Sequence, residues 1–188
     1  KREKKFVMYY GEKVKLRAYK KEDIKLACEY LNDNELKRLL VNYIPYPMIL
    51  EQEEKWFESL LDAKDSYNFA IEDLETGKYI GGCGINSINW LNRYVVIGIF
   101  IGDKNYWGKG YGTDALKVLV KFIFEQMNMN KIKLNVFSFN KRAIRCYEKC
   151  GFQVEGILKQ ELFRDGQYHD EYVMALFYED WKKANKGD

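Results

Sequence analysis

Three glycines alternate with larger residues in Gly108-Lys109-Gly110-Tyr111-Gly112, directly before a strongly helical pattern that begins at Thr113. Glycine lets the backbone adopt positive φ and approach a ligand closely, because no Cβ intervenes. The first turn of the following helix presents unpaired N–H groups and the positive end of the helix dipole, and both attract an anion. Lys109 adds a mobile positive charge. An ordinary tight turn has the same composition, so both interpretations stay open at this point.

The spacing of these glycines differs from that of the two common nucleotide-binding loops. A Walker loop needs the pattern G-x4-G-K-[ST], and the chain contains no such run. A dinucleotide fingerprint needs G-x-G-x-x-G after the first strand of a βαβ unit. Here the glycines are spaced two and two and follow several strand-like segments. Neither an ATPase nor a Rossmann dehydrogenase fits this pattern.

A second cluster of chemically useful residues follows in segment 140–151. Asn140 is a suitable helix N-cap, and Gly151 is suited to end the helix. Asn140, Ala143 and Tyr147 are offset by three and four residues, so they share one helical face. That face carries an amide, a small residue that permits close approach, and a phenol. Packing is the alternative, with Tyr147 in the core and Asn140 as a cap only.

The remaining periodicities predict the elements that position these two clusters. Strands are expected at residues 14–19, 67–72, 79–86, 94–101 and 131–137, with two more within 152–177, and helices at 21–31, 51–61, 113–127 and 140–150. The order βααβββαβαββ indicates helices packed on a mixed, mainly antiparallel sheet, which is an α+β sandwich. We expect a single domain over residues 8–182, with flexible termini at 1–7 and 183–188.

Composition excludes several classes of protein. The 188 residues are 47% hydrophobic and 31% charged, which is ordinary for a globular domain. No run approaches the roughly 20 apolar residues of a membrane helix, and no signal-peptide pattern is present, so we expect a cytoplasmic protein with no membrane association. The net charge of +3 resides in the segment 1–5, and the rest of the chain is near neutral. This balance argues against a nucleic-acid partner.

The metal-binding residue types are sparse. The four cysteines, Cys28, Cys83, Cys146 and Cys150, form no C-x-x-C pair, and His169 is the only histidine. We therefore expect no metal site and four free thiols. A structural hydrogen bond is the expected role of His169.

The two clusters together carry a family resemblance. The glycine turn followed by Asn140-x-x-Ala143-x-x-x-Tyr147-x-Lys149-x-Gly151-Phe152 resembles the GNAT acetyltransferase superfamily, in particular the branch with ribosomal-protein alanine and spermidine acetyltransferases. Supporting matches are Leu16-Arg17, Trp107-Gly108-Lys109-Gly110-Tyr111-Gly112-Thr113 and Arg164-Asp165-Gly166-x-Tyr168-His169-Asp170. The resemblance covers residues 12–182, which is nearly the whole chain.

The resemblance implies a three-layer sandwich whose sheet is splayed between its fourth and fifth strands, with acetyl-CoA in the gap. It assigns the pantetheine arm to the backbone of Ile99, Phe100 and Ile101, to Asn140 and to Ala143. It assigns the pyrophosphate to Gly108, Lys109, Gly110, Tyr111, Gly112 and Thr113. Tyr147 is placed near the sulfur.

The activity that the resemblance implies is N-acetyl transfer from acetyl-CoA to a primary amine by direct attack. The acceptor would be a protein N-terminus, a polyamine or a small-molecule amine. A departing thiolate needs a proton, and Tyr147 is the chain's best general acid. The alternative is a non-catalytic acyl-CoA-binding or regulatory domain of the same fold. The presence of both Asn140 and Tyr147 argues against it, because a CoA sensor needs no thiolate acid.

Two features depart from the family pattern. Trp107 stands where the glycine motif often begins with Gln or Arg. Many relatives also carry a Glu shortly before the glycine of the fourth strand, whereas the residues before Gly98 are hydrophobic here. The general base is therefore not assigned. Glu72, Asn86 with an ordered water, and Ser138 are candidates, and the amine can also lose its proton through water.

The loop at residues 43–48 is rich in tyrosine and contains both prolines of the chain. We expect it to cover the acceptor site, because the family varies its substrate contacts in this region. Core packing and a homodimer surface are alternative roles for its aromatic residues.

Overall fold

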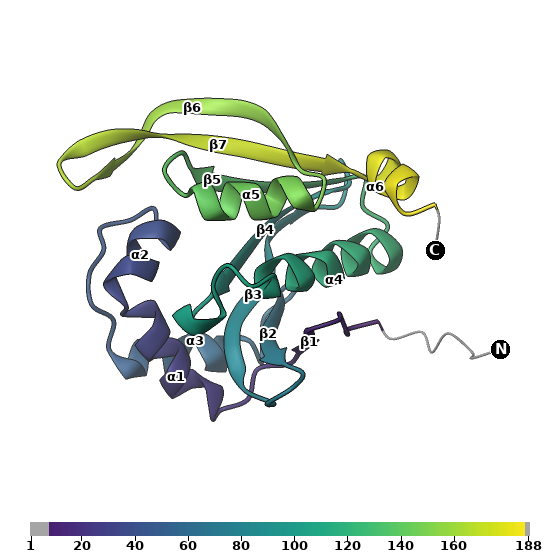
Figure 1. Cartoon of the computed structure of the whole chain (residues 1–188). Helices are drawn as coiled ribbons and strands as arrows, with labels where there is room; N and C mark the ends of the chain where they lie inside the picture. Colours follow the sequence, from purple (N-terminus) through teal and green to yellow (C-terminus); the bar gives the residue numbers. More distant parts are fainter. Residues whose placement is uncertain (1–7, 187–188) are drawn as a thin grey trace.

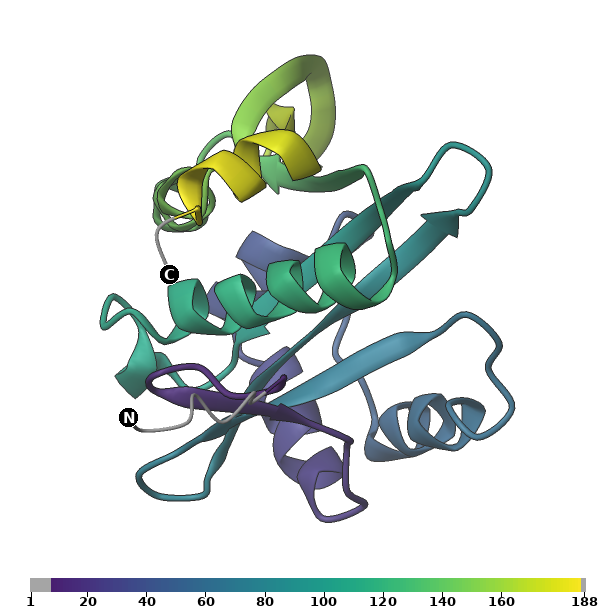
Figure 2. The ribbon, with the colours of Figure 1, turned by 90° about the vertical axis from the view of Figure 1, so that its right-hand side faces the viewer.

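The computed structural model describes residues 8–186 (Figures 1 and 2). Its described strands form one sheet in the order β1-β2-β3-β4-β5-β7-β6. They are β1 (Val14–Arg17), β2 (Tyr67–Asp73), β3 (Tyr79–Asn89), β4 (Tyr94–Ile101), β5 (Lys131–Phe137), β6 (Gln153–Arg164) and β7 (Gln167–Phe177). The helices are α1 (Asp23–Leu31), α2 (Asn34–Leu40), α3 (Leu50–Ser59), α4 (Tyr111–Gln126), α5 (Lys141–Lys149) and α6 (Tyr178–Ala184), with a short 3-10 helix η1 (Lys104–Tyr106).

The sheet separates between β4 and β5. These two strands pair in parallel over only three residue pairs, from Tyr94 with Lys131 to Val96 with Lys133. Every other strand pair is antiparallel. Beyond Val96 the two strands diverge, so within residues 8–186 the edge of β4 that faces β5 is left without a strand partner. The splayed, mainly antiparallel α+β sandwich expected from the sequence is confirmed.

Helix α4 forms the centre of the main core. Its predicted apolar face is fully buried, with Leu116, Leu119, Val120 and Ile123 each at most 2% exposed. This face packs on the sheet together with the buried residues of β4 and β5. Figure 2 shows α4 crossing one face of the sheet, with α1 and α3 below α4 in this view. No helix within residues 8–186 is long and apolar enough to cross a membrane.

The first turn of α4 also fixes the start of β1. The Asp114 carboxylate accepts hydrogen bonds from the backbone N–H groups of Glu12 (3.1 Å), Lys13 (2.8 Å) and Val14 (3.0 Å). Gly11 permits this approach, since a Cβ there would lie 2.2 Å from Asp114 Oδ2. One carboxylate thus connects two segments that are 100 residues apart in sequence.

Two helices were missing from the sequence prediction. Helix α2 follows α1 almost directly and begins at an N-cap, where the Asp33 side chain accepts from Leu36 N–H at 3.0 Å. Helix α6 follows β7 without a loop and ends at Ala184, two residues beyond the predicted domain boundary. Helix α4 begins at Tyr111 rather than Thr113. The predicted flexible segment 1–7 lies outside the described residues, as do residues 187–188.

Candidate active site

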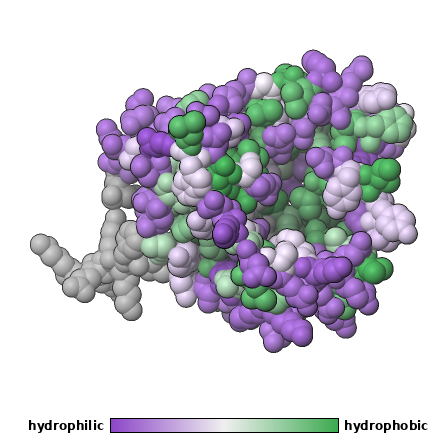
Figure 3. Space-filling model, turned by 180° about the vertical axis from the view of Figure 1, so that it is seen from behind, coloured by the Kyte–Doolittle hydropathy of each residue, from purple (hydrophilic) through white to green (hydrophobic). Residues whose placement is uncertain are grey.

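The divergence of β4 and β5 creates a cavity of about 780 Å³. Figure 3 shows the surface hollowed on this side, with apolar side chains toward the floor of the hollow and hydrophilic ones around it. The glycine turn and α5 form one part of the wall, and α2 contributes another. Ten of the residues that the sequence assigned to the cofactor lie on it: Ile99, Phe100, Ile101, Gly108, Gly110, Gly112, Thr113, Asn140, Ala143 and Tyr147. Their individual roles stay predictions.

Lys109 and Tyr111, the other two assigned residues, do not line the cavity. The glycines on either side of Lys109 adopt the left-handed conformation, with φ of 70° at Gly108 and 87° at Gly110. Lys109 is exposed. The ring of Tyr111 packs edge-on against Tyr106, with the ring centroids 4.7 Å apart. The turn therefore offers backbone to the cavity and directs its two larger side chains elsewhere.

Positive charge on the cavity wall comes from α5 instead. Arg142, Arg145 and Lys149 all line the cavity. They are offset by three and four residues, a helical-face pattern that was readable in the sequence but was not singled out. The Arg142 guanidinium lies 3.5 Å from the centroid of the Trp107 ring, and burial lowers its pKa. This end of the cavity suits a phosphate group.

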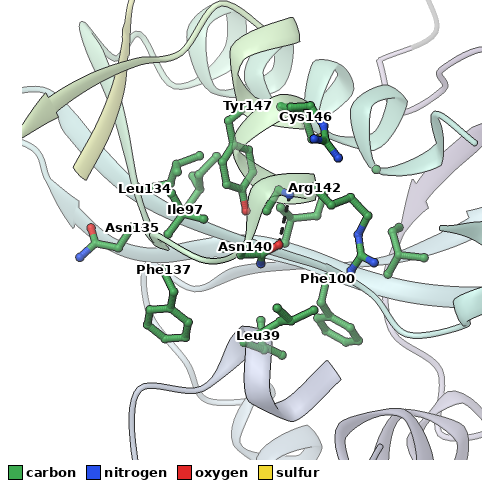
Figure 4. A pocket seen from close by; sticks show the side chains of 18 of the residues that line it. Leu39, Ile97, Phe100, Leu134, Asn135, Phe137, Asn140, Arg142, Cys146 and Tyr147 are labelled. Carbon is green, nitrogen blue, oxygen red and sulfur yellow. Dashed lines mark hydrogen bonds between the residues drawn. The ribbon is translucent and has the colours of Figure 1, made fainter. Parts of the chain in front are cut away.

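Figure 4 shows Asn140 and Tyr147 on the same side of the cavity, with the phenol of Tyr147 directed toward its centre. Asn140 Oδ1 caps α5 by accepting from Ala143 N–H at 3.2 Å. This leaves the amide Nδ2 as a donor for a ligand. Tyr147 is 8% exposed, and burial raises its pKa. The phenol therefore stays protonated at neutral pH and can donate a proton.

Cys146 lies beside the glycine turn. The Thr113 hydroxyl donates to its sulfur at 3.4 Å. A hydrogen bond from the Cys150 thiol, together with the bond from Thr113, lowers the pKa of Cys146 to about 7. Both cysteines are free thiols, as are Cys28 and Cys83. The sequence prediction of free thiols is confirmed, whereas the lowered pKa of one of them was not anticipated.

Glu171 on β7 is the only acidic residue of the described chain that lines this cavity. It pairs across the sheet with Phe137, the last residue of β5, and so lies across the gap from β4. Burial raises the pKa of Glu171, and a hydrogen bond from Asn135 acts in the opposite direction. The sequence prediction missed this residue, because strand alternation alone does not tell which face of β7 meets a cavity.

Only one of the three proposed bases lies at the cavity. Glu72 is held by Arg17 and by Lys15, which together lower its pKa, and it lies away from the wall. Ser138 does not line the cavity either. Asn86 does, and its side chain lies over Gly98, where a Cβ would come within 3.1 Å of Asn86 Nδ2.

His169 and the loop at 43–48 lie outside the cavity. The His169 ring nitrogen Nε2 lies 3.3 Å from the Arg164 carbonyl oxygen, and the ring packs against Phe139. This agrees with the structural role expected for it. In the loop, Tyr43, Ile44 and Tyr46 are 57–83% exposed, so core packing is not their role.

The metal-binding residue types do not gather anywhere in the described chain. Within residues 8–186, no three His, Cys, Asp or Glu side chains are arranged to hold a metal ion.

Comparison with known proteins gives consistent matches. The acetyltransferase (GNAT) domain model matches residues 13–153. An uncharacterized N-acetyltransferase p20 from Bacillus licheniformis is 30% identical over 169 residues, which covers 89% of this chain and 94% of that protein. A spermidine N(1)-acetyltransferase from Escherichia coli is 28% identical over 181 residues, which covers 92% of this chain and 90% of that protein.

The solved structures agree with the sequence relatives. Spermidine N-acetyltransferase from Vibrio cholerae, crystallised with CoA and spermine, superposes with a TM-score of 0.81 at 25% identity. The match covers 90% of this chain and 98% of that one. The splayed sheet, the glycine turn at the start of α4 and the matched domain all indicate one family: the chain is a member of the GNAT acetyltransferases.

Proposed function

We propose that this protein transfers the acetyl group of acetyl-CoA to a primary amine by direct attack. The observation that carries the proposal is the cavity between β4 and β5, which has cationic residues and helix N–H groups near one end and a buried phenol on its wall. A flat or uniformly apolar cavity would not combine these two properties. The relatives named N-acetyltransferases support the same reaction class.

Successive parts of the cavity suit successive parts of acetyl-CoA. The glycine turn and Arg142 would hold the pyrophosphate, because backbone N–H groups and a guanidinium both bind phosphate oxygens. Among the described residues, the β5-facing edge of β4 has no strand partner beyond Val96, and it can pair with the amides of the pantetheine arm. The Ile101 carbonyl already accepts from the Trp107 indole N–H at 2.7 Å, so Ile99 and Phe100 are the freer partners.

Tyr147 is proposed as the general acid. The departing CoA thiolate takes up a proton, and a positioned acid that supplies this proton lowers the barrier to the reaction. The phenol of Tyr147 is buried and protonated, and no protein acceptor competes for its proton among the hydrogen bonds of the described residues. In the alternative, a non-catalytic acyl-CoA-binding domain, this phenol would have no role.

Glu171 is proposed as the group that receives the proton of the amine, directly or through water. It is the only carboxylate on the cavity wall within the described residues, and its raised pKa brings it closer to neutrality. Asn86 lines the same cavity and can orient a water or the amine itself. This assignment replaces Glu72 and Ser138, which lie away from the cavity.

The acceptor is proposed to be a primary amine, with polyamines as the first class to examine because two of the relatives carry spermidine acetyltransferase names. The homodimer predicted from sequence stays a prediction.

The test of the proposed function has two steps. Thermal unfolding with acetyl-CoA, CoA, ATP and NAD measures which nucleotide binds, since a ligand of the folded state raises the melting temperature. Release of free thiol in a panel of amines then measures transfer.

A shift with CoA species alone, together with amine-dependent thiol release, is the expected result. Binding of CoA species without transfer to any amine would favour the non-catalytic alternative. The absence of a shift with acetyl-CoA would overturn both.

A further inference from the structure

A second cavity of about 330 Å³ adjoins the first one. The two share five wall residues, namely Leu40, Asn86, Gly98, Ile99 and Phe100. Residues from α1, α2 and α3 also line the second cavity, so it lies on the face of the sheet that these helices cover. A molecule in this cavity therefore reaches the part of β4 that also borders the main cavity.

Three glycines form the floor of this cavity. Gly82 pairs with Phe100 across β3 and β4, and Gly84 pairs with Gly98, so all four residues share one face of the sheet. Three of them carry no Cβ, so the floor is backbone that the Tyr19 hydroxyl approaches closely at Gly82 and the Asn86 amide at Gly98. Tyr19 and Trp56 stand at its wall, with their rings edge-to-face and the centroids 5.0 Å apart.

Glu53 lines this second cavity. It is the only buried residue of α3 and is 6% exposed, whereas its neighbour Glu54 is exposed. Its carboxylate has no hydrogen bond or ion pair with any described residue, and none of the residues that line the cavity is basic. Burial raises the pKa of Glu53. A buried carboxylate without a partner is costly, and a cationic ligand removes that cost.

Asn68 adds an oxygen acceptor to the same cavity. Its amide Nδ2 donates to Ser66 Oγ at 2.7 Å, which fixes the orientation of the side chain. Its carbonyl oxygen lies over the floor, since a Cβ on Gly84 would come within 2.8 Å of Oδ1. The cavity thus presents a carboxylate, an amide oxygen and two aromatic rings, all of which attract an ammonium group.

We infer that the Glu53 cavity binds a second, non-reacting ammonium group of the acceptor, which makes the acceptor an aliphatic diamine or polyamine. This inference rests on the proposed amine acetylation. The reacting amine would lie near Asn86 and Gly98, on the wall that the two cavities share. The carbon chain would then cross the glycine floor, and the distal ammonium would pair with Glu53.

The inference is tested with pairs of acceptors that differ only at the distal end. α,ω-Diaminoalkanes from diaminopropane to diaminooctane are compared with the monoamines and the amino alcohols of the same chain length. The wild-type protein is assayed beside Glu53→Gln and beside Glu54→Gln. The second variant removes the same charge from an exposed position one residue away on α3.

In the wild-type protein, the preferred diamine is expected to have a kcat/KM at least tenfold higher than its matched monoamine. In Glu53→Gln the KM of that diamine is expected to rise by about tenfold or more, as when one partner of a buried charge pair is removed. The KM values of the monoamine and of acetyl-CoA stay unchanged, and Glu54→Gln behaves like the wild type.

Equal use of diamines and monoamines by the wild type, or an unchanged diamine preference in Glu53→Gln, would overturn the inference. Both results leave the proposed function standing, because transfer to an amine is still observed. Failure of the proposed function is a different result, namely no thiol release with any amine. The melting temperature of each variant, with and without acetyl-CoA, shows that the fold and the nucleotide site are intact.

Discussion

The Arg142 guanidinium stacks on the Trp107 ring, 3.5 Å from the ring centroid, and this contact joins α5 to the glycine turn. Trp107 directly precedes the glycine turn, and Arg142, on another element, supplies positive charge at this end of the cavity. The Trp107 indole N–H is fixed in turn by the Ile101 carbonyl at 2.7 Å. The ring therefore positions the guanidinium beside the proposed phosphate site.

Trp107→Ala is expected to weaken acetyl-CoA binding by about tenfold, because a cation–π contact contributes about 0.5–2 kcal/mol and its loss frees the guanidinium to move. Titration calorimetry with acetyl-CoA measures the change. Trp107→Phe retains a ring and should lose less affinity for acetyl-CoA. The double variant with Arg142→Ala should be no weaker than Arg142→Ala alone, and fully additive losses would show that Trp107 does not act through Arg142.

Tyr147→Phe is expected to lower kcat by about 10²–10⁴, which is the range for a lost acid–base group. The ring still fills the buried site, so the acetyl-CoA dissociation constant and the melting temperature should change little. Because burial raises the pKa of Tyr147 above the ordinary 10.0, the wild-type enzyme should retain its proton donor up to pH 10. A wild-type kcat in the variant would remove Tyr147 from the mechanism.

Glu171 is expected to control the acidic limb of the pH profile. Burial raises its pKa above the ordinary 4.5, and the group accepts a proton only when ionised. Activity should therefore be low at pH values below that raised pKa and should increase as the pH rises through it. Glu171→Gln should lose this limb together with most of kcat. At higher pH, both proteins should still show the pH dependence that comes from deprotonation of the acceptor's own ammonium group.

Glu161→Gln is the matched control for Glu171. The charge of Glu161 contributes to the raised pKa of Glu171, and Glu161 itself is exposed. Its removal should move the acidic limb to slightly lower pH without abolishing it. A limb that persists unchanged in Glu171→Gln would assign the proton to another acceptor, with Asn86 and water as the remaining groups.

Local patterns predicted the strands and helices, whereas the splay of the sheet and the assignment of residues to the cofactor followed from the family resemblance. Alternation identifies the strands of this sheet, and the offsets of Asn140, Ala143 and Tyr147 place them on one helical face. Helix α2 was missed because seven residues give less than two turns of periodicity, and because its Lys37 is buried. Lys37 Nζ donates to Asn32 and to the Tyr46 carbonyl, contacts that only the tertiary fold creates.

The acidic residues of the two cavities were missed for a related reason. Glu53 and Glu171 each lie in an element that the sequence predicts, but a charged residue in a helix or strand is normally assigned to the exposed face. Their burial depends on which segments pack opposite them, and sequence spacing does not contain that information. Likewise, Lys109 was the evident cation near the turn, whereas the cavity takes its cations from α5.

Cys146 is expected to be the first thiol alkylated at neutral pH. Its pKa of about 7 makes a large fraction thiolate, whereas burial raises the pKa of Cys28 and of Cys83. The rate of reaction with iodoacetamide, followed by peptide mass spectrometry, should increase with pH through about 7. Because Cys146 lines the cavity, saturating acetyl-CoA should protect it. Equal labelling with and without acetyl-CoA would separate this thiol from the cofactor site.

Asp114→Ala is expected to lower the free energy of unfolding by about 2 kcal/mol, because three backbone N–H groups lose a charged acceptor. Gly11→Ala should have a similar effect, since its Cβ would lie 2.2 Å from the same carboxylate. Urea unfolding measures both. Glu125→Ala, at an exposed position of the same helix, removes the same charge and should change stability little. If Asp114→Ala were as stable as Glu125→Ala, this carboxylate would not hold β1 to α4.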